Sequence, residues 1–213
     1  MINKNMTIAE ALKENPNVAR VFEDTRLDYC CGGNQNLAEA IEEINFDIDS
    51  YIELLNRQEE RIEESLEDVI KLSKAELIDY IVRNHHVPEL EMIDRIDSNL
   101  RKLINVHYVN HGAELEEVYQ IFLTLKSALI PHFAKEEKED FVDFLDTGVA
   151  DFTSLIAEHE KAGALLERLD FATNSYTAPE DGCNTYRATF ELMREFEKDL
   201  HRHIFLENSV LFE

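Results

Sequence analysis

Regular helical periodicity is the feature of this sequence that most restricts its fold. Apolar residues recur at intervals of three and four along most of the chain, and only six glycines and four prolines interrupt its 213 residues. Glycine and proline are the residues least compatible with a helix interior, so their scarcity favours long helices over strands. The sequence therefore predicts an all-α fold.

Four long helical patterns follow one another from residue 73 onward. They are expected at residues 73–108, 114–139, 151–173 and 180–212. Short breaks separate them, at Gly112, Gly148 and Thr177-Ala178-Pro179. Four amphipathic helices with short connections are typical of an up-down-up-down bundle. Pro88 and Pro131 fall inside the first two helices and predict kinks there.

A small helical domain is expected ahead of the bundle, at residues 1–57. Thr7 and Glu10 have the spacing of a capping box, and the short helix that they open must end before Pro16. Further short apolar stripes predict more helices of this size. The one stretch with the character of a loop reads Asp28-Tyr29-Cys30-Cys31-Gly32-Gly33.

The segment between the two domains, residues 58–72, is mostly charged. We interpret it as a helical or loose linker. A second capping box, Ser73 with Glu76, follows it and opens the carboxyl-terminal domain, which is expected at residues 73–213.

Acidic residues dominate the charge of the chain. Asp and Glu number 45 against 21 Lys and Arg, for a formal net charge of −24. Such a surface repels phosphate backbones and anionic headgroups, which argues against nucleic acid and membranes as partners. No apolar run approaches the roughly 20 residues that span a bilayer, and the amino terminus lacks the pattern of a signal peptide. The acidity suits a protein that handles cations, and it suits a merely soluble protein equally well.

Cysteine usage predicts a reducing compartment. Cys30 and Cys31 are adjacent, and neighbouring cysteines rarely form a disulfide because the small ring is strained. The third, Cys183, is distant from both. No secreted disulfide framework is expected, and the cytoplasm is the predicted location. Cys183, near the start of the last helix, is predicted to be a small buried residue.

Two histidine–glutamate pairs share one spacing: His132 with Glu136, and His203 with Glu207. Four residues make about one helical turn, so each pair presents an imidazole and a carboxylate on the same face. One such pair is common by chance on a helix surface. Two pairs on separate predicted helices are a stronger indication of a metal site.

The other two predicted helices carry His85 and His159. Counted from one end of the bundle, the four histidines lie about 7 to 12 residues in, which at about 1.5 Å per residue places them in one layer. Four imidazoles with two carboxylates can give each of two irons two nitrogens while both carboxylates bridge the pair. The alternative is a set of ordinary surface pairs that happen to share this depth.

The remaining histidines are predicted to lie outside this layer. His86 and His201 lie beside or near a candidate ligand but point about 100° or more away around the helix, so they are not expected to face the same core. His107 and His111 are on the order of 30 Å from His85 along a continuous helix. We expect these four residues to face solvent or to support the ligands from behind.

With these residues in place, the chain resembles the iron–sulfur cluster repair di-iron proteins, the repair-of-iron-centres family, over essentially its full length. The dicysteine loop matches that family's signature. The resemblance implies a hemerythrin-like four-helix bundle behind a small helical domain. It implies two non-haem irons in an oxo-bridged di-iron centre, with the ligands His85, His132, Glu136, His159, His203 and Glu207. The matching bundle segments are Ile81–His85, His132–Glu137, Glu158–Gly163 and His203–Asn208.

The resemblance also implies a function, the repair of iron–sulfur clusters damaged by nitrosative or oxidative stress, with the centre donating iron. Damaged iron–sulfur proteins would then be the partners. Two alternatives stay open: a nitric oxide reductase fed by an electron donor, and a sensor whose iron state changes the docking of the small domain. The chain has no G-x-G-x-x-G signature, so turnover would require an external reductase. Whether it is an enzyme, and whether it forms a homodimer, stay open as well.

Two departures argue against a reversible oxygen carrier. True hemerythrins, as a family, carry a second histidine four residues after the third-helix ligand, whereas this chain has Gly163 there. Their last helix supplies an aspartate five residues after its histidine, whereas the carboxylate here is Glu207, four residues on. The loss of an imidazole should leave one iron less saturated and easier to exchange.

The role expected of Cys30 and Cys31 is a transient relay of iron or sulfur, or a redox-sensitive contact. A thiolate is a soft iron ligand and a nucleophile. Gly32 and Gly33 would let the backbone bend enough to expose it. The alternative is that the pair packs a corner between short helices.

Overall fold

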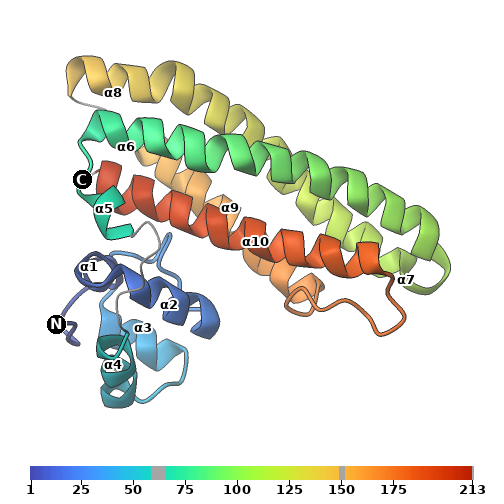
Figure 1. The fold of residues 1–213 in the computed structure, drawn as a ribbon, viewed down its shortest axis with the longest axis horizontal. Helices are drawn as coiled ribbons and strands as arrows, with labels where there is room; N and C mark the ends of the chain where they lie inside the picture. The colour runs from blue at the N-terminus through green and yellow to red at the C-terminus, as the bar shows by residue number, and fades with distance from the viewer. Residues whose placement is uncertain (59–65, 149–151, 213) are drawn as a thin grey trace. The chain divides into compact units, whose positions relative to one another are not determined.

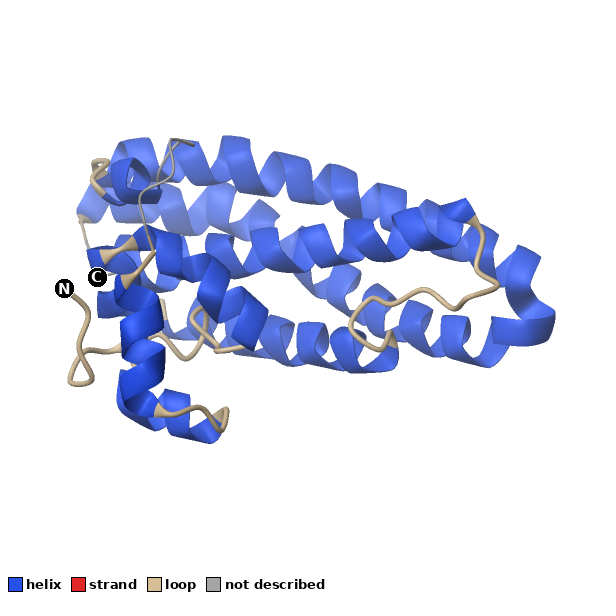
Figure 2. Ribbon diagram, turned by 60° about the horizontal axis from the view of Figure 1, so that its bottom comes forward, coloured by secondary structure: helices blue, strands red, loops and turns tan. Residues whose placement is uncertain are grey.

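The computed structural model describes residues 1–58, 66–148 and 152–212. Within these ranges the regular structure is helical, and an isolated bridge between Thr7 and Asn36 is the only extended pairing there (Figure 2). The predicted all-α fold class is confirmed. No helix in the described ranges is both long enough and apolar enough to cross a membrane.

The chain forms two compact units. The first contains Met1–Tyr80 together with His201–Glu213, and the second contains Ile81–Leu200. Most of the charged segment expected as a linker, at residues 59–65, lies outside the described residues. Its far end is helical, at Leu66–Ile70. The expected boundaries at 1–57, 58–72 and 73–213 stay predictions.

The first unit contains a series of short helices, which Figure 1 shows in blue to green. Both predicted capping boxes are formed there. The Thr7 side chain accepts from the Glu10 backbone N–H at 3.1 Å, and Ser73 does the same for Glu76 at 3.4 Å. The elements are α1 (Ile8–Glu14), the 3-10 turn η1 (Pro16–Val18), α2 (Ala19–Thr25), α3 (Leu37–Glu43), α4 (Ile48–Asn56), α5 (Leu66–Ile70) and most of α6 (Lys74–Ile81).

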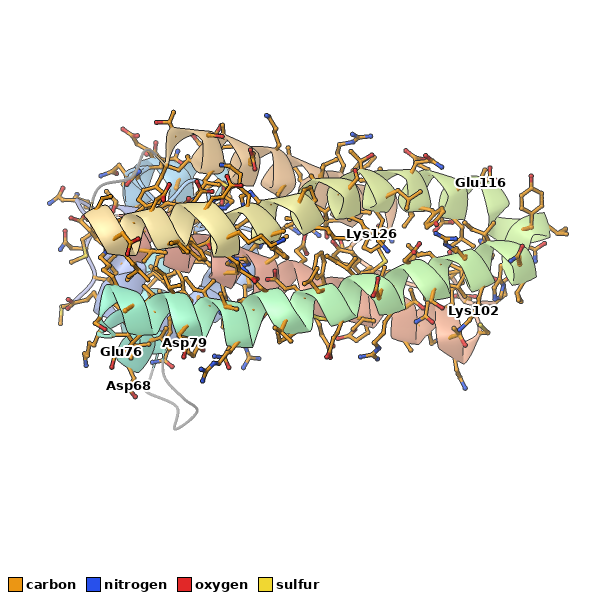
Figure 3. The ribbon with its side chains drawn as sticks, turned by 90° about the horizontal axis from the view of Figure 1, so that it is seen from above. Asp68, Glu76, Asp79, Lys102, Glu116 and Lys126 are labelled. Atoms are coloured by element: carbon orange, nitrogen blue, oxygen red, sulfur yellow. The ribbon has the colours of Figure 1, made fainter. Side chains whose placement is uncertain are left out.

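The second unit is built on one long helical element, α7 (Val87–Lys135), which doubles back on itself (Figure 1). Lys126 Nζ lies 3.3 Å from Asp94 Oδ1 and 3.1 Å from Asp97 Oδ2. A straight helix would separate Lys126 from Asp94 by about 48 Å, so the two arms must run antiparallel. Figure 3 shows Lys126 between these arms. At the break predicted near Gly112 the chain therefore reverses its direction, and its backbone stays helical through the reversal.

Three further helices complete the second unit. They are α8 (Phe141–Thr147), α9 (Thr153–Ala172) and α10 (Asn184–Leu206), whose last residues belong to the first unit. α9 packs along α7, and the Tyr186 hydroxyl of α10 donates to Glu114 of α7 at 3.4 Å. The two arms of α7, α9 and α10 correspond to the four long helices predicted from the sequence.

Three π-helical turns interrupt these helices. They are η2 (Val82–His86), η3 (Glu136–Asp140) and η4 (Glu207–Leu211), and in each a backbone N–H bonds the carbonyl five residues earlier. A π turn spreads one extra residue over a turn and so changes which side chains share a face. Periodicity analysis assumed 3.6 residues per turn throughout and did not predict them. Each π turn contains a histidine or glutamate that the sequence selected as a metal ligand.

The left-handed backbone conformation of Gly148 predicts how a substitution there affects stability. It ends α8 with φ of +68°, and a Cβ atom placed there would meet no atom within 4 Å. Gly148→Ala should therefore lower the free energy of unfolding by about 1 kcal/mol through backbone strain alone. Urea denaturation measures it, with Gly148→Asn as the control because asparagine tolerates this conformation better. An alanine variant as stable as the wild type would contradict the assigned conformation.

Candidate metal centre

A fully buried carboxylate, Glu136, lies at the middle of a cluster in the second unit. It begins η3 and is 0% exposed. Its Oε1 lies 3.3 Å from His132 Nε2 and 3.9 Å from His159 Nε2, and the two imidazole nitrogens are 3.0 Å apart. His132 comes from α7 and His159 from α9. The structure thus brings together three of the six ligands that the sequence selected.

His86 contradicts the sequence analysis. It was expected to face away from the core, yet it is 0% exposed, and its Nε2 lies 3.5 Å from Glu136 Oε2. The physical reason is the π turn η2, which holds both His85 and His86 on the buried side. A signal was present in the sequence: Pro88 cannot donate a backbone hydrogen bond to residue 84, which favours an irregular turn at this point.

Carboxylates lie behind three of the imidazoles. The Nδ1 atoms of His85, His86 and His132 contact carboxylate oxygens at 3.1, 2.9 and 2.7 Å, respectively. An ionised carboxylate only accepts, so each Nδ1 carries the proton and each Nε2 is left with a lone pair. The carboxylate partners are Asp199, Glu137 and Glu158.

Glu158 shows the strength of one of these pairs. Partial burial raises the pKa of this carboxyl, but the hydrogen bond from His132 and the positive charge of Lys135 outweigh burial and lower the pKa below its ordinary value. Glu158 therefore stays ionised at neutral pH and holds the His132 ring in one tautomer. The sequence analysis did not select this residue.

His85, Glu89 and Asp199 form a second cluster. Each of them has one potential ligand atom within 4.8 Å of those of the other two. Glu89 is buried and was also missed. Its signal was available, because Glu89 follows His85 by four residues, the same spacing as in the two pairs that were selected. Asp199 sits on α10, and its side chain is 29% exposed.

His203 and Glu207 form the corresponding pair in the first unit. His203 Nε2 lies 3.2 Å from Glu207 Oε1, and both side chains are buried. Glu207 begins the π turn η4, as Glu136 begins η3. These two residues belong to a different unit from the other four, and the grouping of all six in one centre stays a prediction.

The donor set fits a transition-metal cation. Imidazole nitrogens and carboxylate oxygens suit iron, zinc and manganese. Burying two imidazoles against a carboxylate is costly unless a positive charge or hydrogen bonds compensate. The convergence of His132, His159 and Glu136 is what cation binding requires.

The dicysteine loop of the first unit is organised by Asp28. Its Oδ1 accepts from the backbone N–H groups of Cys30 and Cys31 at 3.1 and 3.0 Å. Cys30 is buried, and the hydrogen bond with Cys31 and the burial both raise the pKa of its thiol. One ligand atom each from Asp28, Cys30 and Cys31 also lie within 4.8 Å of one another. All three cysteines of the chain are free thiols.

The two glycines of this loop lie in a bend at Gly32 and a turn at Gly33, as expected of them, and both are also closely packed. A Cβ on Gly32 would lie 2.7 Å from the Asp28 carbonyl oxygen, and one on Gly33 would lie 3.0 Å from Ser209 Oγ. The side-chain amide of Asn208 donates to the Cys30 carbonyl at 3.2 Å. The loop is thus held against η4, directly beside Glu207 in the sequence.

His107, His111 and His201 are the histidines that were expected to lie outside the metal-binding layer and have not yet been described. His107 and His111 are partly exposed, and His111 Nε2 contacts Asp181 Oδ1 at 2.8 Å. His201 is half-buried and meets the Tyr29 ring edge-on, with ring centroids 6.1 Å apart. All three histidines were expected to lie outside the cluster around Glu136. For His201, which belongs to the first unit, this expectation stays a prediction.

Cys183 differs from its prediction as a buried residue, because it is exposed. It precedes α10 in a connecting segment. Its Sγ lies 3.3 Å from His107 Nε2, and this hydrogen bond, aided by backbone N–H groups at the helix start, lowers the pKa of the thiol to about 7.

Cys183 should therefore be the thiol that alkylates fastest near neutral pH. Its thiolate forms as pH rises through about 7, so the iodoacetamide rate should reach half its maximum there. Peptide mass spectrometry across a pH series measures this rate. His107→Ala should move the midpoint upward, toward that of an ordinary cysteine. A midpoint that the substitution does not move would show that His107 is not the cause.

Two family models match most of the chain. A family model described as the hemerythrin HHE cation binding domain matches residues 77–213. A second model, ScdA_N, described as a domain of unknown function, matches residues 4–59.

Three relatives match the chain from end to end. Iron–sulfur cluster repair protein ScdA of Staphylococcus epidermidis is 28% identical over 224 residues, which cover 100% of this chain and 99% of that protein. ScdA of Staphylococcus haemolyticus is 27% identical, with 100% and 98% covered. Iron–sulfur cluster repair protein YtfE of Escherichia coli is 30% identical over 218 residues, with 100% and 97% covered. The chain therefore belongs to the iron–sulfur cluster repair family of hemerythrin HHE cation-binding proteins.

Proposed function

We propose that this protein restores iron–sulfur clusters damaged by nitrosative or oxidative stress, and that it does so by supplying iron. The observation that carries the proposal is the convergence of buried imidazoles on Glu136 in a chain that belongs to this family. The relatives that match from end to end are named for iron–sulfur cluster repair. Damaged iron–sulfur proteins are the proposed partners.

The proposed cofactor is a pair of non-haem irons in an oxo-bridged centre, held by the six residues selected from the sequence. All six lie within the stretch that matches the HHE domain. A bound iron pair would supply a store of redox-active metal that can be released to an acceptor. The proposed ligands are His85, His132, Glu136, His159, His203 and Glu207.

The residues of the chain set how such iron is held. Glu158 keeps the proton of His132 on Nδ1, so that Nε2 points a lone pair toward Glu136. Asp199 does the same for His85. Partners of this kind fix ring orientation and raise ligand basicity, and their loss commonly costs 10–100-fold in metal affinity. Because Asp199 and Glu158 are partly exposed, displacement of these carboxylates by a partner would loosen the ligands from outside.

The dicysteine loop is proposed to act in the transfer of iron or sulfur to the client. Its support is the anchoring of Cys30 to Asn208, the residue after the ligand Glu207. Since the pKa of Cys30 is raised, we assign the exposed part of the relay to Cys31, which is less buried. The alternative, a packing role for the pair, predicts that the loop tolerates serine without loss of repair.

Isotope transfer tests the donor proposal. Protein loaded with ⁵⁷Fe is mixed with a nitric-oxide-damaged [4Fe–4S] protein that contains natural-abundance iron. We expect about two irons per wild-type chain, and ⁵⁷Fe in the restored cluster by Mössbauer spectroscopy. His132→Ala should lose iron and repair together, because it removes a ligand that faces Glu136. His107→Ala, distant from Glu136 in the sequence, is the matched control.

Three outcomes would contradict the proposal. Cluster repair without ⁵⁷Fe in the product would exclude donation. Consumption of nitric oxide with many turnovers per chain, in the presence of an external reductant, would favour the reductase alternative. An unchanged iron content in His132→Ala would exclude His132 as an iron ligand and contradict the proposed ligand set.

Replacing Cys30 and Cys31 together by serine tests the relay. We expect the iron content to stay unchanged and the repair rate to fall at least tenfold, since serine offers no soft ligand or nucleophile at neutral pH. Cys183→Ser is the control, because it removes a thiol outside the loop. Repair at the wild-type rate by the double variant would exclude the relay and leave the packing role.

A further inference from the structure

The dicysteine loop of the first unit brings together three potential metal donors of its own. Cys30 Sγ lies 3.4 Å from Cys31 Sγ and 3.2 Å from Asp28 Oδ1. One donor atom from each of the three residues lies within 4.8 Å of those of the other two. None of the three belongs to the six proposed iron ligands, so the cluster needs an explanation of its own.

A tight turn is what gathers these donors. Adjacent side chains point to opposite sides of an extended segment and about 100° apart on a helix, so two neighbouring cysteines do not ordinarily meet. Here the Asp28 carboxylate accepts the backbone N–H groups of Cys30, Cys31 and Gly32 at 3.1, 3.0 and 3.1 Å. The turn that results holds both thiols beside the carboxylate that forms it. The arrangement is therefore built into the backbone of the loop.

The distances between the donors suit a tetrahedral cation. With metal–sulfur bonds of about 2.3 Å and metal–oxygen bonds of about 2.0 Å, tetrahedral geometry places two sulfurs about 3.8 Å apart and a sulfur and an oxygen about 3.5 Å apart. The distances in the loop, 3.4 and 3.2 Å, are only slightly shorter. A linear ion between two thiolates would need its sulfurs about 4.6 Å apart, which this loop does not provide. The geometry thus favours tetrahedral over linear coordination.

Two thiolates and a carboxylate are donors for borderline and soft divalent ions, such as Zn²⁺ and Fe²⁺. We propose that Asp28, Cys30 and Cys31 form a metal site in the first unit, which binds one such ion in tetrahedral geometry. Binding displaces the thiol protons to solvent, and the ion stays divalent, so no electron is transferred. The three donors leave the fourth position to a ligand from outside the loop, as in zinc sites that exchange a ligand.

The exposure of the loop lets a cation enter and leave. Cys30 is buried, Cys31 is half-buried and Asp28 is exposed, so the site opens to solvent on the side of the carboxylate. A thiolate of a client protein would take the fourth position and then draw the ion away by ligand exchange. This role in iron supply rests on the proposed function, whereas the site itself rests on the geometry of the loop.

Zinc K-edge X-ray absorption tests the site in the full-length, iron-loaded protein, because it observes zinc separately from iron. One equivalent of Zn²⁺ is added to reduced protein in the absence of air. We expect two sulfur neighbours at about 2.3 Å from the zinc. Cys30→Ser and Cys31→Ser should each remove one of them, and Cys183→Ser, the control thiol outside the loop, should remove neither. Fewer than two sulfur neighbours in the wild type, or two in either loop variant, would overturn the site.

Competition with a metal-binding dye measures what Asp28 adds to the affinity. Asp28→Asn keeps a side-chain oxygen that accepts the backbone N–H groups, but it lacks the negative charge of a carboxylate ligand. We expect this variant to bind Zn²⁺ at least about tenfold more weakly with both sulfur neighbours retained. Asp24→Asn, which changes an exposed carboxylate of α2, is the matched control. An unchanged affinity in Asp28→Asn would overturn the three-donor site.

The site and the proposed function can fail separately. Zinc bound by two sulfurs, in a protein that delivers no ⁵⁷Fe to a damaged cluster, would support the site and exclude iron donation. Delivery of ⁵⁷Fe by a protein whose zinc has no sulfur neighbour would support donation and overturn the site.

Discussion

The burial of the Glu136 carboxylate is the constraint on which the rest of the second unit depends. A fully buried carboxylate must be compensated by a positive charge or by hydrogen bonds. Three imidazoles from separate helical segments direct their Nε2 atoms at it, as ligands of a shared cation would. Those rings are effective only if their protons are held on Nδ1. Glu137 and Glu158 hold them there for His86 and His132, so the acidity of the chain has a specific use at this site.

The π turns connect this chemistry to the helices. A histidine or glutamate of the proposed ligand set lies in each of η2, η3 and η4. A regular helix offers one narrow face to the core, and a ligand set of this density needs more positions than that face supplies. Adding one residue to a turn widens the face locally while the helix continues. The cost is a weaker hydrogen-bonded turn, which the surrounding apolar packing of residues such as Phe133 and Phe141 offsets.

In the first unit, the dicysteine loop and η4 form one local structure. Asp28 closes the loop by accepting three backbone N–H groups, and Asn208 and Ser209 hold it against the turn that begins at Glu207. A shift of the Glu207 backbone would therefore move Asn208 and Ser209, which contact the loop. Glu207 and the dicysteine loop are thus linked by a short path, one peptide bond to Asn208 and one hydrogen bond from Asn208 to Cys30, which suits the proposed transfer of iron or sulfur.

The sequence by itself determined the all-α class, both capping boxes, the break at Gly148, the helix end near residue 173, and the spacing that places His132 and Glu136 on one face, because these follow from local spacing at 3.6 residues per turn. The helix expected to end at residue 139 continues through η3 and α8 to Thr147. Only the tertiary structure decided that His86 is interior, that Cys183 is exposed, and that Glu158 and Asp199 lie behind their histidines. Two physical reasons account for what the sequence did not show. A π turn shifts the face that a residue occupies, and a contact between residues on different helices leaves no trace in local periodicity.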